Sequence, residues 1–521
     1  MSSTNRALFI ALFSAVFLAH FLLILVPRAP LEEDAFITCR FAENLAAGKG
    51  FVFNEGERVE GFSNPSLVMA LALAARLGLP TPQTTQVIGL ASVVVLIVCF
   101  TCRRRAPLAE ADRWARLAAV PLCVTSFPFV FWAHQGLETS LYALLLTAGT
   151  LCLLEPRPRS HWWGGLWLAV AVWTRPEAPL LAAAALLALA LTAGPRPALR
   201  GAVPLLLATV GLELWRIAYF GDPLPNTYYA KPPRGIGRSF NFLFDFFRLT
   251  HGWYLIPVLV MAFLASVRDR SSRLLVPVAV VAAQLCFIVY EGGDKKPNHR
   301  FMVPVLPLLS YLTAYVLASL ATRRGETVRK AVVIAGVALL VGVNLMCRVL
   351  PPGGGGETYA ALRVAAQSFG PRTWQAQLEQ RLATFERGYV PANPHTEIGL
   401  WVKRTIEPGT TIAYDQMGQT PYFSGHEYRY IDLFGLTDYT VAHLKKQYGT
   451  EIVPELIDYL ERRAPEFILT HLDMKIPLVA HPCAGRGCRF CAFLATYEDF
   501  GPITDRAGNR LGSALRRKPP R

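Results

Sequence analysis

Residues 7–26 read ALFIALFSAVFLAHFLLILV, an apolar run without Asp, Glu, Lys or Arg, and this run decides the fold class. Such a stretch is long enough to cross about 30 Å of hydrocarbon as an α-helix. A cleaved signal peptide is the alternative, but Val26-Pro27-Arg28-Ala29-Pro30 lacks the expected small-x-small cleavage site. We therefore predict a membrane anchor.

The composition extends this interpretation to the whole chain. Of its 521 residues, 53% are hydrophobic and 17% are charged, whereas soluble proteins carry about 25% charged residues. This excludes a cytosolic enzyme, a disordered chain and a small disulfide scaffold. The net charge of +15 is typical of basic cytoplasmic loops, and no nucleic-acid recognition module is visible.

Further apolar runs predict about eleven transmembrane helices. The short run from Leu67 to Leu79 is left out of this count, because its length and the following Pro80 favour a re-entrant or juxtamembrane helix. The basic loops then all fall on the cytoplasmic side. The further runs lie near residues 87–102, 115–133, 139–154, 162–173, 178–193, 202–220, 252–266, 273–290, 302–320 and 331–350.

An odd number of spans places the C-terminal part of the chain outside the cytoplasm. The Pro/Gly run 351–356 predicts a hinge between a membrane domain (1–350, first external loop 27–66) and a soluble domain (351–521). Strand-like runs there alternate with helical stretches, which predicts an α-helical polytopic membrane protein with a C-terminal extracytoplasmic α/β domain. Examples are the strand-like runs 411–414 and 467–470 and the helical stretch 453–463.

Unusual polar residues gather in the external loops, where functional residues are expected. Glu32, Glu33 and Asp34 directly follow the first predicted span. A carboxylate there can accept a proton from an attacking hydroxyl or hold a divalent cation. Alternatively, these residues cap the N-terminus of a short helix, whose dipole favours acidic side chains.

The motifs in these loops resemble those of class C (GT-C) membrane glycosyltransferases, which use polyprenyl-phosphate sugars as donors. Among these, the sequence is most similar to the terminal β-(1→2)-arabinofuranosyltransferase family, and the resemblance covers nearly the whole chain. The matching motifs are Glu33-Asp34-Ala35-Phe36-Ile37-Thr38-x-Arg40, Gly136-Leu137-Glu138-Thr139, Thr174-Arg175-Pro176-Glu177, Gly221-Asp222-Pro223-Leu224-Pro225-Asn226-Thr227-Tyr228-Tyr229-Ala230-Lys231, Gly292-Gly293-Asp294 with Arg300-Phe301, Asp415-x-x-Gly418 and Asp432-Leu433-x-Gly435-Leu436-Thr437-Asp438.

The chain departs from the family pattern at two places. The family usually has Asp-Asp where this chain has Glu33-Asp34, which affects the identity of the base. Lys295-Lys296 replaces a usually apolar stretch, which affects the phosphate or acceptor site.

The resemblance implies a GT-C fold and an inverting glycosyltransferase. It would move a sugar, arabinofuranose by similarity, from a polyprenyl-phosphate donor to an envelope glycan or glycoprotein. It implies a multi-pass protein of the bacterial inner (plasma) membrane in contact with membrane lipid, with its active site and C-terminal domain on the periplasmic side. The sequence requires no cofactor and leaves a divalent cation open.

Two other functions are alternatives. One is a GT-C transferase for mannose or an aminosugar, because sugar choice depends on pocket shape. The other is a lipid-linked-sugar flippase or transporter. The second is disfavoured because the chain shows no internal repeat, and its polar clusters lie at helix ends rather than at the bilayer midplane.

The resemblance also assigns candidate site residues. Asp34 is the predicted catalytic base, with Glu33 in reserve. Basic side chains at outer helix ends are candidates for the donor phosphate, although such residues also snorkel to the interface. These are Arg175, Lys231, Arg300 and His299. For the sugar or acceptor the candidates are Glu138, Asp222, Asp294, Asp415 and Tyr228, where Tyr228 is equally typical of an interfacial aromatic belt.

Two further clusters are interpreted as structural. Glu213 and Arg216 lie three residues apart within a predicted span, which predicts a mutual ion pair because isolated charges in a membrane are costly. The tail residues His481, Cys483, Cys488 and Cys491 form a disulfide, a zinc site or free thiols.

Overall fold

The computed structural model describes residues 31–101, 110–231, 236–320, 326–349, 393–449, 452–471 and 489–519. The predicted first span, the Pro/Gly hinge and three members of the tail cluster (His481, Cys483 and Cys488) lie outside these residues. The chain divides into two compact units. The helical unit contains Gln86–Gly211 and Pro233–Gly388, and the mixed unit contains Pro30–Thr85, Leu212–Pro232 and Tyr389–Arg521.

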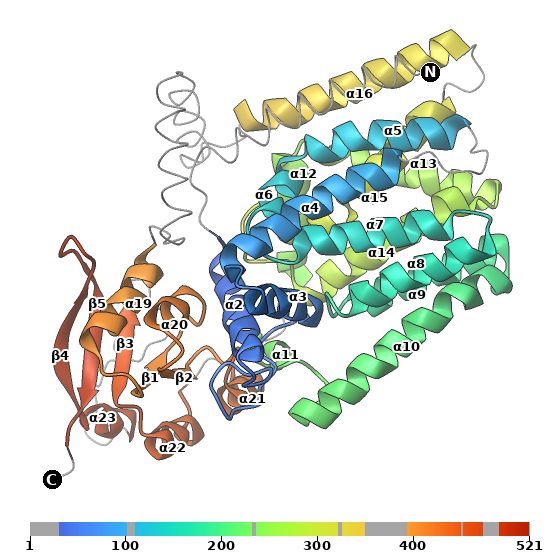
Figure 1. Cartoon of the computed structure of the whole chain (residues 1–521). Helices are drawn as coiled ribbons and strands as arrows, with labels where there is room; N and C mark the ends of the chain where they lie inside the picture. The colour runs from blue at the N-terminus through green and yellow to red at the C-terminus, as the bar shows by residue number, and fades with distance from the viewer. Residues whose placement is uncertain are drawn as a thin grey trace. The chain divides into compact units, whose positions relative to one another are not determined.

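Apolar helices packed against one another make up the helical unit (Figure 1). The neighbours α7 and α8, α9 and α14, and α5 and α15 are in extensive contact. The helices are α4 (Thr81–Thr101), α5 (Glu110–Val124), α6 (Phe127–Ala133), α7 (Thr139–Leu153), α8 (Pro158–Val172), α9 (Ala178–Ala193), α10 (Pro195–Phe220), α12 (Ile236–Leu249), η1 (Gly252–Tyr254), α13 (Leu255–Arg268), α14 (Ser272–Glu291), η2 (Arg300–Val305), α15 (Leu306–Leu320) and α16 (Glu326–Val349). The first residues of α4 and the last of α10 belong to the mixed unit.

By length and composition, four of the described helical stretches can cross a membrane: α4, α10, α14 and the continuous η2–α15 segment. Two bent pairs, α5 with α6 and α12 with η1–α13, raise this number to six. Leu191 on α9 and Leu207 on α10 are largely exposed, at 70% and 68%, which fits lipid rather than water around these helices. The chain is a multi-pass membrane protein, and the count of about eleven spans stays a prediction.

A buried ionic cluster ties three helices and one loop of this unit together. The Arg116 guanidinium donates to Asp112 at 3.0 Å and to Glu155 at 3.1 Å. Tyr311 donates to the second oxygen of Asp112 at 2.6 Å, and Arg273 pairs with the same carboxylate at 2.7 Å. A buried charge is tolerated only when it is paired and hydrogen-bonded, so this cluster fixes α5, α14 and α15 against the loop after α7.

A five-stranded sheet of order β2-β1-β3-β5-β4 forms the centre of the C-terminal part of the mixed unit. Strand β1 (Thr411–Tyr414) runs parallel to its neighbours β2 (Arg429–Asp432) and β3 (Phe467–His471), whereas β5 (Arg510–Arg517) is antiparallel to β3 and to β4 (Tyr497–Thr504). The strands predicted at 411–414 and 467–470 are thus observed. The helices α19 (Pro394–Thr405), α20 (Gln419–Ser424), α21 (Tyr439–Tyr448), α22 (Pro454–Arg463) and α23 (Arg489–Leu494) pack with this sheet (Figure 1).

The predicted first external loop and the apolar run that follows it belong to the same unit. The loop contains α2 (Glu33–Ala46), which packs on α3 (Pro65–Arg76), and α3 is the short helix expected near 67–79. The segment carrying α11 (Asn226–Ala230) also joins this unit, because Asn226 donates hydrogen bonds to the carbonyls of Gly435 and Leu436. The two units therefore do not follow the expected boundary near residue 350.

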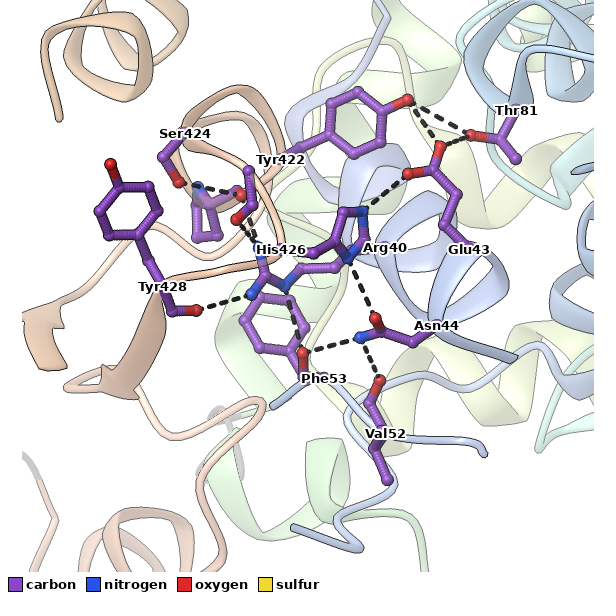
Figure 2. A network of polar contacts seen from close by, with 12 residues as sticks. Arg40, Glu43, Asn44, Val52, Phe53, Thr81, Tyr422, Ser424, His426 and Tyr428 are labelled. Carbon is purple, nitrogen blue, oxygen red and sulfur yellow. Dashed lines mark hydrogen bonds and ion pairs between the residues drawn. The ribbon is translucent and has the colours of Figure 1, made fainter. Parts of the chain in front are cut away.

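Arg40 on α2 is the polar centre of the mixed unit (Figure 2). It is only 1% exposed and donates to the carbonyl oxygens of Phe53 at 3.2 Å, Pro421 at 2.6 Å, Gly425 at 2.8 Å and Tyr428 at 3.0 Å. Burial lowers the pKa of the guanidinium to about 10, so it stays charged at neutral pH. Arg40 thereby holds the turn between α20 and β2 against α2.

We expect Arg40→Met to destabilise the mixed unit by roughly 3 kcal/mol, because four buried carbonyls lose a charged donor. Hydrogen–deuterium exchange of the detergent-solubilised protein should show faster exchange in residues 411–432. Arg404→Met on the exposed end of α19 is the matched control. Unchanged exchange in the Arg40 variant would show that the hydrogen bonds from Arg40 to the four carbonyl oxygens do not hold this turn in place.

Candidate functional site

Arg175, a predicted phosphate ligand, is held between two carboxylates in the helical unit. Its Nε donates to Glu177 at 2.9 Å and its Nη1 donates to Glu138 at 2.8 Å. Glu138 and Glu177 are the N-cap residues of α7 and α9, and Arg175 lies in the turn before α9. The guanidinium is therefore fixed at the ends of two apolar helices.

Arg300, the second predicted phosphate ligand, lies beside Arg175. Both guanidinium carbons stack on the Phe301 ring, at 5.6 Å for Arg175 and 5.3 Å for Arg300. Arg300 donates from Nε to Asp294 at 2.8 Å, and within the described part of the chain its two terminal nitrogens donate no hydrogen bond. These nitrogens can form the bidentate contact that arginine makes with phosphate.

The two arginines determine the charge of Glu138. Burial alone would raise the pKa of this carboxyl, but Arg175 and Arg300 outweigh burial and hold the pKa below its ordinary value of 4.5. The opposite charges likewise raise the pKa of Arg175, despite its burial. Glu138 and Arg175 therefore form an ion pair at neutral pH, and Asp294 orients the second guanidinium group, that of Arg300.

His299, the remaining phosphate candidate of this unit, packs between aromatic rings. Its ring centroid lies 5.2 Å from that of Phe242 and 5.6 Å from that of Phe246, both on α12. Burial lowers the pKa of His299 to about 4, so the imidazole is neutral at neutral pH. A neutral ring brings no positive charge to a phosphate, and this geometry favours a packing role.

The two acidic residues after the first span start α2 in the mixed unit. Glu33 Oε1 accepts hydrogen bonds from the backbone N–H groups of Gly418 at 2.6 Å and Gln419 at 3.2 Å. A Cβ on Gly418 would lie 2.0 Å from the Glu33 carbonyl oxygen, so only glycine fits there. Asp34, the next residue, lies in the same first turn of the helix and is half-buried. Glu33 is thus an anchor of α2 in this structure.

Glu43 and Asn44 form a second attachment at the other end of α2 (Figure 2). The His426 ring nitrogens lie 2.8 Å from Glu43 Oε2 and 3.0 Å from Asn44 Oδ1. Thr81 and Tyr422 donate to the other Glu43 oxygen at 2.6 Å and 2.8 Å. Burial opposes ionisation of Glu43, but these hydrogen bonds prevail and lower its pKa.

The sugar candidates Asp222 and Tyr228 belong to the mixed unit, around α11. Asp222 accepts a hydrogen bond from Tyr229 at 2.7 Å and lies 3.6 Å from His443 on α21. Tyr228 is 37% exposed, and the Lys446 ammonium lies 4.3 Å from its ring centre. The phosphate candidate Lys231 is exposed at the end of α11 and does not share a unit with Arg175 and Arg300.

Asp415 directly follows strand β1, at the carboxyl end of the parallel part of the sheet. It is 7% exposed, and its Oδ1 lies 3.3 Å from Nε2 of His471, the last residue of β3. The His395 ring lies 5.0 Å from that of His471. This cluster is built from three segments far apart in sequence, and only Asp415 was singled out by a motif.

Several partners of the candidate residues were missed by sequence reasoning. The expected pair Glu213–Arg216 is confirmed at 2.8 Å, but Arg216 also binds Glu60 of the first loop through two hydrogen bonds of 2.7 Å and 3.1 Å. The Glu138–Arg175 pair was also missed, because its two residues are 37 positions apart in the sequence. A charged side chain in a buried or membrane-embedded segment needs an oppositely charged partner. Where the neighbouring residues do not supply enough partners, such a charge is a signal that a distant residue does.

The tail cysteine cluster is only partly described. Cys491 is disulfide-bonded, while His481, Cys483 and Cys488 lie outside the described residues. Among the residues that the structure describes, no group of three His, Cys, Asp or Glu is arranged to hold a metal ion. The expectation that no cofactor is required, with a divalent cation left open, stays a prediction.

Sequence comparison finds two relatives that share one name. The terminal β-(1→2)-arabinofuranosyltransferase of Mycobacterium tuberculosis H37Rv is 31% identical over 227 residues, which cover 40% of this chain and 36% of that protein. The protein of that name from Corynebacterium glutamicum is 22% identical over 333 residues, or 54% of this chain and 47% of that protein. The chain thus spans less than half the length of these relatives. A family model described as a domain of unknown function (DUF8728) matches residues 376–509.

Solved structures match over almost the whole chain. ArnT from Cupriavidus metallidurans bound to undecaprenyl phosphate superposes with a TM-score of 0.53, at 14% identity, over 99% of this chain and 98% of that one. The archaeal oligosaccharyltransferase AglB from Archaeoglobus fulgidus, in complex with an inhibitory peptide and a dolichol-phosphate, has a TM-score of 0.54 at 10% identity, over 98% of this chain and 74% of that one.

The chain therefore has the fold of the GT-C membrane glycosyltransferases. Within that class its sequence is similar to the terminal β-(1→2)-arabinofuranosyltransferases, and the family identification made from the loop motifs is confirmed.

We expect Glu138→Gln to destabilise the protein at pH 7 by about 2 kcal/mol, because the buried Arg175 loses an ionised partner. The arginines lower the folded-state pKa of Glu138, so its stabilising contribution is complete above the ordinary value of 4.5 and is lost as the pH falls through the lowered pKa. Thermal unfolding in detergent should thus show a difference from wild type that persists down to pH 4.5 and shrinks only below it.

The exposed Glu213→Gln, at 41% side-chain exposure, is the control for this measurement and should show a small difference. A constant Glu138→Gln difference from pH 7 to pH 3 would contradict the electrostatic explanation.

Proposed function

We propose that this chain is an inverting glycosyltransferase that takes its sugar from a polyprenyl-phosphate donor. The observation that carries the proposal is the pair Arg175–Arg300, fixed by carboxylates at the ends of apolar helices, with two donor nitrogens of Arg300 left open. The undecaprenyl phosphate bound by ArnT and the dolichol-phosphate bound by AglB support a lipid phosphate as the ligand of this fold.

The chemistry requires positive charge at the leaving group. When the bond between the anomeric carbon and the phosphate oxygen breaks, the phosphodiester becomes a monoester with one more negative charge. Preorganised donors that face this developing charge lower the barrier. In this proposal Arg300 supplies the donors, Asp294 orients it, and Arg175 adds charge held in place by Glu138 and Glu177.

Asp34 is the proposed base. It accepts the proton of the acceptor hydroxyl as that oxygen forms its bond to the anomeric carbon, which inverts the configuration at this carbon. The neighbouring Glu33 is less suited to this task, because one of its carboxylate oxygens already accepts two backbone hydrogen bonds. In this proposal Glu33 anchors α2, and its reserve assignment as base stays a prediction.

The finer assignments rest on the sequence relatives. Their shared name supports arabinofuranose as the sugar, and an envelope glycan or glycoprotein is the proposed acceptor. The proposed location is the outer face of the bacterial inner membrane, with about eleven spans and an extracytoplasmic C-terminal α/β domain. Asp222, Tyr228 and Asp415 are the proposed contacts of the sugar or acceptor.

We expect Asp34→Asn to abolish sugar transfer while donor binding stays within about twofold of wild type, because the amide cannot accept the proton. The assay follows release of polyprenyl phosphate from a labelled polyprenyl-phospho-arabinofuranose by the purified full-length protein. Glu55→Gln, an exposed carboxylate of the same loop, serves as control. Full activity of Asp34→Asn would remove this residue from the base role.

We expect Arg300→Lys to lower kcat/KM for the donor about tenfold and Arg300→Gln about a hundredfold or more. Lysine keeps the charge but loses the bidentate fork, and glutamine loses both. The exposed Arg157→Gln should leave kcat/KM unchanged. If Arg300→Gln and Arg157→Gln behave alike in steady-state kinetics, the leaving phosphate is bound elsewhere.

A further inference from the structure

Helix α12 differs from its neighbours in presenting three chemically different faces. Ser239, Phe242 and Phe246 are buried against the helical unit. The apolar residues at four-residue spacing on the next face are more than half exposed and form a contiguous row of large apolar side chains. They are Ile236 (63% exposed), Phe240 (61%) and Phe244 (55%).

The third face of α12 is polar. Arg238, Asn241 and Arg248 are exposed, and Arg248 pairs with the half-buried Asp245 at 3.0 Å. A helix of fourteen residues with two arginines and an aspartate is too charged to lie across the hydrocarbon core. A broken span or a re-entrant hairpin would place this polar face in lipid tails, so both are disfavoured.

The direction of α12 fits a helix that lies along a membrane surface. The chain bends by 111° between α12 and the η1–α13 segment. If α13 crosses the bilayer close to its normal, α12 lies within about 20° of the membrane plane. The exposed apolar residues of α13, among them Val260 (52%) and Leu264 (60%), continue the apolar surface from α12, with Trp253 packed against Phe244 at the bend (5.4 Å).

The buried face of α12 forms one wall of the Arg300 loop. Ser239 donates to the Val289 carbonyl at 3.0 Å. A Cβ on Gly293 would lie 2.8 Å from Phe242 Cβ, so helix and loop are in direct contact at this glycine. Together with the Phe242 and Phe246 contacts to His299, α12 covers the loop from Gly293 to Arg300 on one side.

We propose that α12 is an interfacial helix, embedded sideways in the lipid–water boundary of one leaflet, with bilayer phospholipid covering Ile236, Phe240 and Phe244. Its polar face points toward headgroups and water, as in other helices that lie in the interface. The continuity with the lipid-facing surface of α13 identifies lipid as the occupant. Through its buried face, α12 then holds the Gly293–Arg300 loop at the depth of the headgroups.

The test uses the full-length protein in nanodiscs of phosphatidylethanolamine and phosphatidylglycerol. A benzophenone amino acid is introduced singly at positions 240 and 244, and at 241 and 238 as controls on the polar face. All four side chains are exposed, so folding should tolerate each change. Irradiation followed by mass spectrometry should give phospholipid adducts about fivefold or more abundant at 240 and 244 than at 241 and 238.

Equal phospholipid adducts at all four positions would show a re-entrant or spanning helix and overturn the proposal. Protein–protein adducts at 240 and 244 in place of lipid adducts would assign this face to a second copy and overturn it too. Because the readout is lipid contact and not sugar transfer, either result would leave the proposed glycosyltransferase function in place.

Discussion

The buried guanidinium of Arg40 is the constraint on which the mixed unit depends. Its acceptors are neutral carbonyls, one in the first loop and three in the segment 421–428, so their number and direction must compensate for the lost hydration. Chain segments 381 residues apart therefore cannot separate without leaving a charge unsolvated. Helix α2, which carries Glu33 and Asp34, is ordered by the fold of a region far along the sequence, and this explains why the first loop joins the C-terminal residues in one compact unit.

In the helical unit the buried arginines pair with carboxylates instead of carbonyls. The number of donor nitrogens that each arginine uses in these pairs distinguishes a structural arginine from one that can bind a ligand. Arg116 lies between the carboxylates Asp112 and Glu155, and Tyr311 completes this structural cluster. Arg175 is similarly bound to two carboxylates. Arg300 donates to Asp294 through Nε alone, and its two terminal nitrogens stay available to a ligand. Since a buried cation with open donors is costly without a ligand, Arg300 is the arginine of this group best suited to bind an anion.

Local patterns in the sequence predicted much of this fold, because apolar periodicity and strand alternation depend on neighbouring residues. The strands near 411 and 467 and the Glu213–Arg216 pair are of this kind. The four backbone carbonyls around Arg40 and the Glu60–Arg216 pair could not be predicted. Every residue has a backbone carbonyl, so the sequence does not show which ones accept a hydrogen bond. Residues that are far apart in the chain follow no regular spacing that would identify them as a pair. The domain boundary predicted near residue 350 stays a prediction. It rests on a change of composition, whereas the polar contacts that join the first loop to the C-terminal residues in one compact unit are long-range.

The departure from the family pattern at Glu33 has a physical explanation. A glutamate has one methylene more than the aspartate usual at this position, and it reaches the N–H groups of Gly418 and Gln419 at 2.6 Å and 3.2 Å. Gly418 permits this approach, because any side chain there would collide with the Glu33 carbonyl. Adjacent carboxylates on one helix turn differ in function when their neighbours differ. A carboxylate that accepts two backbone hydrogen bonds is a poorer proton acceptor, and this supports the anchoring role of Glu33 in a proposal whose base is Asp34.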